Sequence, residues 1–128
     1  MKKLRLGNVL LCDYVSPGHG NKHVLVNTYT ADIVVTEFPV RMQFGLYAEI
    51  FLDPDQPRSL QVDILVGKKR VIEIQAEFAD DGGGHPALLA IPIFTAVAER
   101  ETTLQIVLSC EGYRKTTAIR KTISCPTA

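Results

Sequence analysis

The clearest pattern in the sequence is a regular alternation of apolar and polar side chains from Arg41 to Leu52. One side of this segment carries only apolar residues, namely Met42, Phe44, Leu46, Ala48, Ile50 and Leu52. Successive side chains of a β-strand point to opposite faces, so a period of two indicates a strand with one buried and one solvated face. The same pattern returns at Leu60–Val66, Ile72–Phe78 and Leu104–Cys110. Repeated alternation of this kind predicts antiparallel sheets.

Turn signals separate these segments. Gly67-Lys68-Lys69 lies between two alternating runs and predicts a tight hairpin. Before the long strand, a first strand is expected from Leu4 to Tyr14. The residues expected together on its apolar side are Leu4, Leu6, Leu10 and Cys12. In the apolar run Leu88–Val97, Pro92 predicts a sheet edge or a bulge, because proline cannot donate a ladder hydrogen bond.

Together these segments predict an all-β fold for the whole chain. We expect an antiparallel two-layer β-sandwich of about seven to nine strands, with an immunoglobulin-like or a C2-like topology. A length of 128 residues is natural for one domain, and no linker divides it, so residues 1–128 are expected to form a single β-sandwich domain.

Charge and composition narrow the classes of partner. Lys plus Arg equals Asp plus Glu at 14 each, so the formal net charge is zero. A neutral chain has no global attraction to nucleic acid or to an anionic membrane, and neither is expected as a partner. It also has little electrostatic protection against self-association, so a homo-oligomer is compatible with the composition. Arg5 and Asn8 interrupt the apolar residues near the start, which argues against a signal peptide and for a cytoplasmic protein.

No motif in the sequence predicts catalysis or a cofactor. Serines occur in no GxSxG setting, and no helix is expected after Gly82-Gly83-Gly84 to bind a phosphate, so the protein is not expected to be an enzyme. Cys12 and Cys110 are interpreted as reduced thiols, with a disulfide between them as the alternative. His19 and His23 are interpreted as surface histidines rather than as zinc ligands, since a turn separates them.

Aspartates in two predicted loops offer a second kind of site. These residues are Asp53, Asp55, Asp80 and Asp81. Sandwich proteins of the C2 type bind calcium with aspartates from loops at one end, and the two loops would emerge at the same end of an up-and-down arrangement. Aspartate is also a favoured turn residue, so the calcium site is an alternative hypothesis.

Short motifs in the first third of the chain resemble a known family. The segment Leu10-Leu11-Cys12-Asp13-Tyr14 is followed by a glycine-containing turn with Asn21-Lys22, and Phe38-Pro39 precedes the long alternating strand. In this the chain resembles an uncharacterised bacterial family of small β-sandwich proteins that open with a similar strand. The family turns through Gly-Lys where this chain has Asn21-Lys22. The resemblance implies a sandwich fold and carries no activity and no functional residue.

Apolar residues at nominally outward strand positions suggest a function. They are Tyr47, Phe51, Leu65 and Val71, together with Ile91 and Ile93 from the run Leu88–Phe94. Exposed apolar patches on soluble domains often mark interfaces, although these strands could equally be covered on both faces within the monomer. The sequence thus predicts a non-enzymatic module that binds a protein or copies of itself. The alternative is a calcium-dependent C2-like module that binds membranes or ligands.

Overall fold

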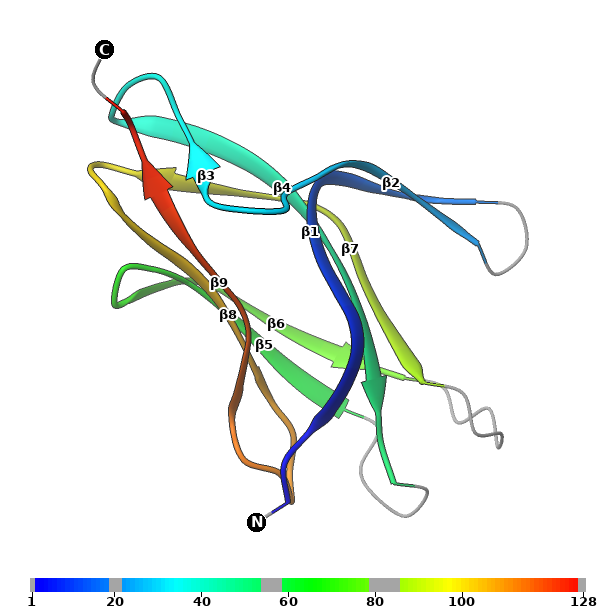
Figure 1. Cartoon of the computed structure of the whole chain (residues 1–128). Helices are drawn as coiled ribbons and strands as arrows, with labels where there is room; N and C mark the ends of the chain where they lie inside the picture. The colour runs from blue at the N-terminus through cyan, green and yellow to red at the C-terminus, as the bar shows by residue number, and fades with distance from the viewer. Residues whose placement is uncertain (1, 19–21, 54–58, 79–85, 127–128) are drawn as a thin grey trace.

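The part of the chain that the structure describes consists of β-strands and connecting turns (Figure 1). The computed structural model describes residues 2–18, 22–53, 59–78 and 86–126. Nine strands lie in these ranges: β1 (Arg5–Pro17), β2 (His23–Thr28), β3 (Ile33–Val34), β4 (Val40–Phe51), β5 (Ser59–Val66), β6 (Lys69–Glu77), β7 (Ala87–Ala98), β8 (Thr102–Ser109) and β9 (Thr116–Ser124). None of the described residues lies in a helix that could cross a membrane. The all-β prediction is confirmed.

The strands form two sheets, one with the order β2-β1-β4-β7 and one with the order β3-β9-β8-β5-β6. Neighbours pair antiparallel, with one exception: β3 runs parallel to β9, with Ile33 opposite Ile123 and Val34 opposite Ser124. The prediction that all strands pair antiparallel is therefore wrong for β3. This exception is short, because β3 contributes only two residues to the ladder.

A single apolar core fills the space between the two sheets. The predicted inward side of β4 is confirmed, since Phe44, Leu46, Ala48 and Ile50 are completely buried. The opposing sheet contributes the alternating apolar residues of β5 and β8, which are Leu60, Val62, Ile64, Leu104, Ile106 and Leu108. The hairpin predicted between β5 and β6 is also present, and Gly67 takes the left-handed conformation (φ 63°) that its turn requires.

Two bulges break the alternation and correct the predicted sides of β1 and β7. In β1, Leu6 lies opposite Ile50 but Val9 lies opposite Ala48, so Gly7 and Asn8 together face the single residue Glu49. The extra residue reverses the faces beyond it. Leu4 is buried as expected, but Leu10, expected on the same side, points outward, and its neighbour Leu11 enters the core.

The second bulge lies in β7 at Pro92, where a bulge or an edge was predicted. Phe94 is opposite Phe44 and Ile91 is opposite Leu46, so Pro92 and Ile93 face the single residue Gly45. Both features are present, since β7 is also the last strand of its sheet among the described residues. Ile91 consequently faces the core and is 8% exposed, whereas Ile93 points outward. The outward position predicted for Ile91 is wrong for this reason.

No disulfide joins Cys12 and Cys110, so the disulfide alternative is not realised. Cys12 lies in the four-stranded sheet beside Gly45, and Cys110 follows β8 in the five-stranded sheet. Burial raises the pKa of both thiols above its ordinary value, with smaller contributions from Asp13 and Glu111 respectively. Both residues behave as small buried groups.

Candidate binding surface

The β1–β2 hairpin leaves the plane of the four-stranded sheet at Cys12. We call its outer part, residues 13–17 of β1 together with β2, the arm; Figure 1 shows it at upper right. Gly45 lies at the bend. A Cβ atom placed on Gly45 would point to the outer side of β4 and lie 2.8 Å from the backbone nitrogen of Val15. The arm therefore crosses the outer face of β4 in direct contact with its backbone.

The face of the arm that lies on the sheet is buried at Val15 and half-buried at Leu25 and His23. Val15 is 1% exposed, although it does not belong to the core between the sheets. Farther along the arm, the ring of His23 meets the ring of Tyr47 edge-on, with 5.9 Å between centroids. The Cys12 thiol lies 3.3 Å from the carbonyl oxygen of Tyr14 and 3.5 Å from that of Gly45. These contacts hold the arm against the outer face of β4.

Asp13 ties the two strands of the arm together at its base. Its carboxylate accepts hydrogen bonds from the Asn27 side chain at 3.0 Å and from the Tyr29 hydroxyl at 3.0 Å. Burial, and then the hydrogen bond to Asp13, raise the pKa of Tyr29 to about 12, so this hydroxyl keeps its proton at neutral pH. Asn27 has a positive φ of 53°, which asparagine tolerates better than most residues. The start of the arm is thus fixed by polar contacts.

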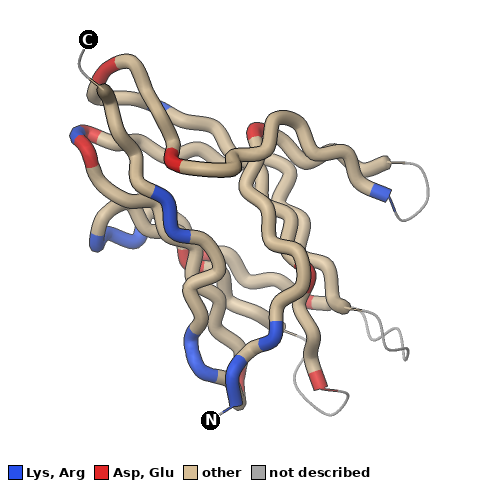
Figure 2. The backbone as a smooth tube through the Cα atoms, viewed as in Figure 1, with Lys and Arg blue, Asp and Glu red and all other residues tan. Residues whose placement is uncertain are grey.

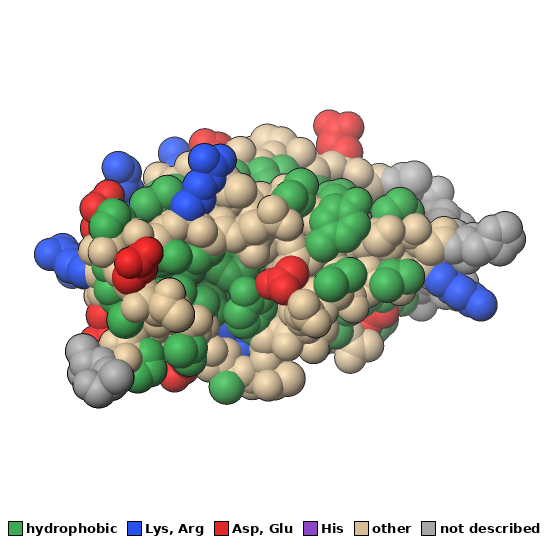
Figure 3. Space-filling view, turned by 90° about the horizontal axis from the view of Figure 1, so that it is seen from above, with side chains coloured by type: hydrophobic (Ala, Val, Ile, Leu, Met, Phe, Trp, Pro, Cys, Tyr) green, Lys and Arg blue, Asp and Glu red, His purple; other side chains and the backbone are tan. Residues whose placement is uncertain are grey.

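The other face of the arm is apolar and exposed. Because side chains alternate, Tyr14 pairs with Val26 and Ser16 with Val24 on the side opposite Val15. The exposed fractions are 37% for Tyr14, 54% for Val24 and 40% for Val26. Figure 3 shows the molecule from above, with hydrophobic side chains exposed at several places on this face, some of them beside the grey segment on the right. The arm therefore presents an apolar strip to solvent.

The backbone edge of β2 is also available. No described strand pairs with β2 on the side away from β1. The sequence of β2, HVLVNT, contains no lysine, arginine or acidic residue and no proline, which are the residues that usually protect an edge strand from pairing. Both the edge and the outward face of the arm are therefore suited to contact another chain.

The remaining sheet edges differ from β2 in this respect. The edge strand β6 carries Lys69, Arg70, Glu73 and Glu77, and β7 is interrupted by its bulge at Pro92. The edge strand β3 is only two residues long. Charge, proline and shortness are all ways of blocking edge pairing. Within the described residues, β2 is the edge that lacks them.

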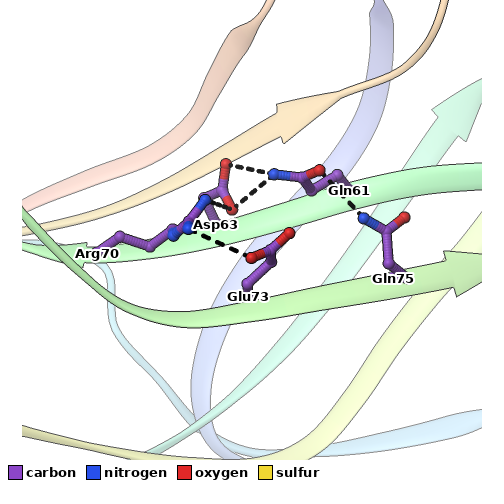
Figure 4. A network of polar contacts seen from close by, with 5 residues as sticks. All are labelled: Gln61, Asp63, Arg70, Glu73 and Gln75. Carbon is purple, nitrogen blue, oxygen red and sulfur yellow. Dashed lines mark hydrogen bonds and ion pairs between the residues drawn. The ribbon is translucent and has the colours of Figure 1, made fainter.

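Figure 4 shows a network of polar contacts between five side chains of β5 and β6. Asp63 is 7% exposed, and both of its carboxylate oxygens accept a hydrogen bond from the Gln61 side-chain amide at 3.1 Å. The Arg70 guanidinium lies 3.6 Å from the Asp63 carboxylate. Arg70 also lies 3.3 Å from Glu73, and Gln75 donates to Gln61 at 3.1 Å. These five side chains contact one another, so this part of β5 and β6 is polar.

The predicted interface residues are spread over several surfaces. Tyr47 is covered by His23 of the arm, and Phe51 lies beneath the guanidinium of Arg5, 5.4 Å from its ring centroid. Leu65 is half-buried on the outer side of β5, while Val71 and Ile93 are exposed. The structure does not bring them into one patch. Sequence reasoning missed Tyr14, Val24 and Val26, because Val24, Leu25 and Val26 are consecutive apolar residues and the sequence does not show which of them face outward.

The calcium candidates can be assessed only in part. Asp55, Asp80 and Asp81 lie outside the described residues, as does His19. Within the described ranges, no three His, Cys, Asp or Glu residues are grouped as metal ligands would be. Asp53 is engaged by protein groups: its Oδ2 lies 2.8 Å from the Lys2 ammonium and accepts a hydrogen bond from the Tyr113 hydroxyl at 3.1 Å.

These contacts make a testable prediction about pH. The hydrogen bonds from Lys2 and then Tyr113 hold the pKa of Asp53 below its ordinary value. A lowered folded-state pKa stabilises the protein above the unfolded-state pKa of about 3.9, and this contribution is lost as pH falls through the folded-state value. We expect Asp53→Asn to reduce the loss of thermal stability on acidification, measured by melting curves from neutral to strongly acidic pH. Glu111→Gln, which removes an exposed carboxylate nearby, is the control; equal behaviour of the two variants would contradict the assignment.

Comparison with known proteins adds no relative. No protein-family model matches the chain, and no curated protein matches its sequence.

Proposed function

We propose that this chain is a non-enzymatic β-sandwich module that associates with a second copy of itself through the arm. The observation that carries the proposal is the unprotected edge of β2 beside the exposed side chains of Tyr14, Val24 and Val26. An edge strand with free backbone groups can extend its sheet onto another chain, and the apolar strip adds surface to be buried in that contact.

Self-pairing fits the chemistry of β2 better than pairing with a charged partner. In a twofold dimer the same patch meets itself, so each charge on the patch would face a like charge or lie near one. β2 has no charged residue, and the whole chain has zero formal net charge. Antiparallel pairing of two β2 strands would therefore cost no repulsion between their own side chains.

The strand order also supports an immunoglobulin-like form of the sandwich over a C2-like form. In immunoglobulin-type domains the second and fifth conserved strands pair in one sheet, and strands C, F and G form the other. Here β4 pairs with β7, and β5, β8 and β9 are neighbours, with β6 added beside β5 as an extra C′ strand would be. In this comparison β2 belongs to an additional hairpin, which suits a role in association.

The proposal predicts a dimer that depends on the arm. Val26→Lys places a charge on the exposed face of β2, where two copies would bring like charges together, and is expected to weaken the dimer by about tenfold or more. Sedimentation velocity from low to high micromolar concentration measures this. Val34→Lys is the matched control, because Val34 is 65% exposed on β3 and away from the arm.

Two outcomes would contradict the proposal. One is a wild-type protein that remains a monomer over the whole concentration range. The other is a dimer that Val26→Lys and Val34→Lys weaken equally, since that would locate the contact elsewhere or reduce it to a general effect of charge. Melting curves of both variants verify that they are folded.

A further inference from the structure

Cations from two distant parts of the chain meet at the end of the molecule that carries the N-terminus. One group belongs to the first residues of the chain and the other to the turn between β8 and β9; we call them together the basic end, formed by Lys2, Lys3, Arg5, Arg114 and Lys115. All five are exposed. Figure 2 shows both blue stretches beside the mark N. Two carboxylates, Asp53 in contact with Lys2 and Glu111 beside Arg114, border the same end, so the five cations outnumber them.

The backbone holds these cations in place. Lys2 and Tyr113 form a parallel β-bridge, and the backbone N–H of Arg114 donates to the Lys2 carbonyl oxygen at 2.8 Å. The Asp53 backbone N–H also donates to the Tyr113 hydroxyl, at 3.1 Å. Three segments are thereby joined around one buried tyrosine. A binding surface whose backbone is fixed in advance loses less conformational entropy when it takes a ligand.

The surface beside Tyr113 is hollowed on both sides. One hollow, of about 570 Å³, is bordered by Arg114, Lys115 and Glu111. The other, of about 330 Å³, is bordered by Lys2, Lys3 and Arg5 and also by Asp53, the carboxylate that Lys2 contacts. An extended ligand that carries several negative charges could lie across Tyr113 and reach cations in both hollows, whereas a single small anion could reach only one.

We propose that the basic end binds an acidic segment of a partner protein in an extended conformation. The cations favour a ligand with negative charge, and the two separate hollows favour one in an extended conformation. The aromatic groups argue for a peptide over single-stranded nucleic acid, which proteins bind by stacking bases on exposed rings. Tyr113 is only 5% exposed and its hydroxyl is engaged by Asp53, while Arg5 covers Phe51.

The test uses a short dye-labelled peptide rich in glutamate, with binding followed by fluorescence anisotropy at low ionic strength. We expect binding that weakens with added salt, because exposed ion pairs are screened. The double variant Arg114→Gln/Lys115→Gln should weaken binding by about fivefold or more, since two exposed ion pairs are lost. Lys68→Gln/Lys69→Gln is the matched control: it removes the same charge from the β5–β6 hairpin, at the other end of the molecule, and should leave affinity nearly unchanged.

Three results would overturn the proposal. They are no binding of the peptide at low salt, an equal loss of affinity in the two double variants, and binding of a single-stranded oligonucleotide of matched length and charge that is as tight as that of the peptide. The proposal does not depend on dimer formation through the arm, because it rests on different residues. Sedimentation and anisotropy can therefore fail or succeed separately.

Discussion

Replacing Leu11 by alanine is expected to lower the free energy of unfolding by about 3 kcal/mol, because it removes a fully buried leucine from a packed core. Leu11 is 1% exposed and faces the other sheet from β1. The same substitution at the adjacent Leu10, which is 37% exposed, is expected to cost less than about 1 kcal/mol. Urea unfolding of the two variants measures the difference.

This pair of variants tests the bulge in β1 directly. With unbroken alternation from Leu4 and Leu6, Leu10 would be the buried residue and Leu11 the exposed one. The bulge at Gly7 and Asn8 reverses this, and it is fixed by a hydrogen bond of 2.9 Å from the Asn8 backbone N–H to the Glu49 carboxylate. A larger loss from Leu10→Ala than from Leu11→Ala would show that β1 has no bulge there.

The second large effect is expected at Gly45. Its missing side chain leaves room for the arm: a Cβ atom would lie 2.8 Å from the Val15 nitrogen and 2.9 Å from the Pro92 carbonyl oxygen. Both are backbone atoms, so relief requires the arm or β7 to move. Gly45→Ala is therefore expected to cost about 3 kcal/mol, at the upper end of the usual penalty for overpacking.

Gly7→Ala provides the matched control for Gly45. A Cβ atom on Gly7 would lie 2.9 Å from a carboxylate oxygen of Glu49 and 3.1 Å from its Cβ, so a shift of this side chain relieves the contact at the expense of its hydrogen bond to Asn8, and no neighbouring strand has to move. Its cost should be about 1 kcal/mol or less. Thermal and urea unfolding compare the two. If Gly45→Ala is no more destabilising than Gly7→Ala, then the arm does not lie on the backbone of β4.

The parts of the fold that could be predicted are those in which local pattern and tertiary packing agree. The alternation in β4 predicts the correct buried face. This strand pairs with β1 along one edge and with β7 along the other, and its inner face packs against the opposing sheet. The Gly67 turn was equally readable, since a glycine between two alternating runs supplies the positive φ that a tight hairpin needs.

The parts that could not be predicted depend on a single extra residue in a strand, or on contact with a segment that is distant in the sequence. One extra residue in β1 and one in β7 exchange the faces of the residues beyond them, so regular alternation predicts the wrong side for Leu10 and for Ile91. Gly7 lies in the bulge of β1 and Pro92 in the bulge of β7. Neither residue type on its own specifies the position at which the register shifts. The crossing of the arm over Gly45 leaves no periodic signal at all.

The candidate surface could also be predicted only in part. Tyr47 and Phe51 are apolar and point outward, as the alternation of β4 indicates. What covers them comes from distant parts of the chain, His23 from the arm and Arg5 from the start of β1. Apolar residues remain exposed on the arm that does the covering, at Tyr14, Val24 and Val26, and also on other strands, at Leu10, Val34, Val71, Ile93 and Val97. Which apolar residues stay exposed could therefore be read only from the structure.

The measurement that tests self-association through the arm most directly is hydrogen exchange of the β2 backbone amides at low and high protein concentration. In a monomer, the amides on the side away from β1 have no described strand to bond and should exchange rapidly. The proposed pairing of β2 with a second copy predicts that these same amides become protected as concentration rises, while those of β6, the charged edge, do not change. Rapid exchange of the β2 edge amides at a concentration where the protein sediments as a dimer would contradict the proposal.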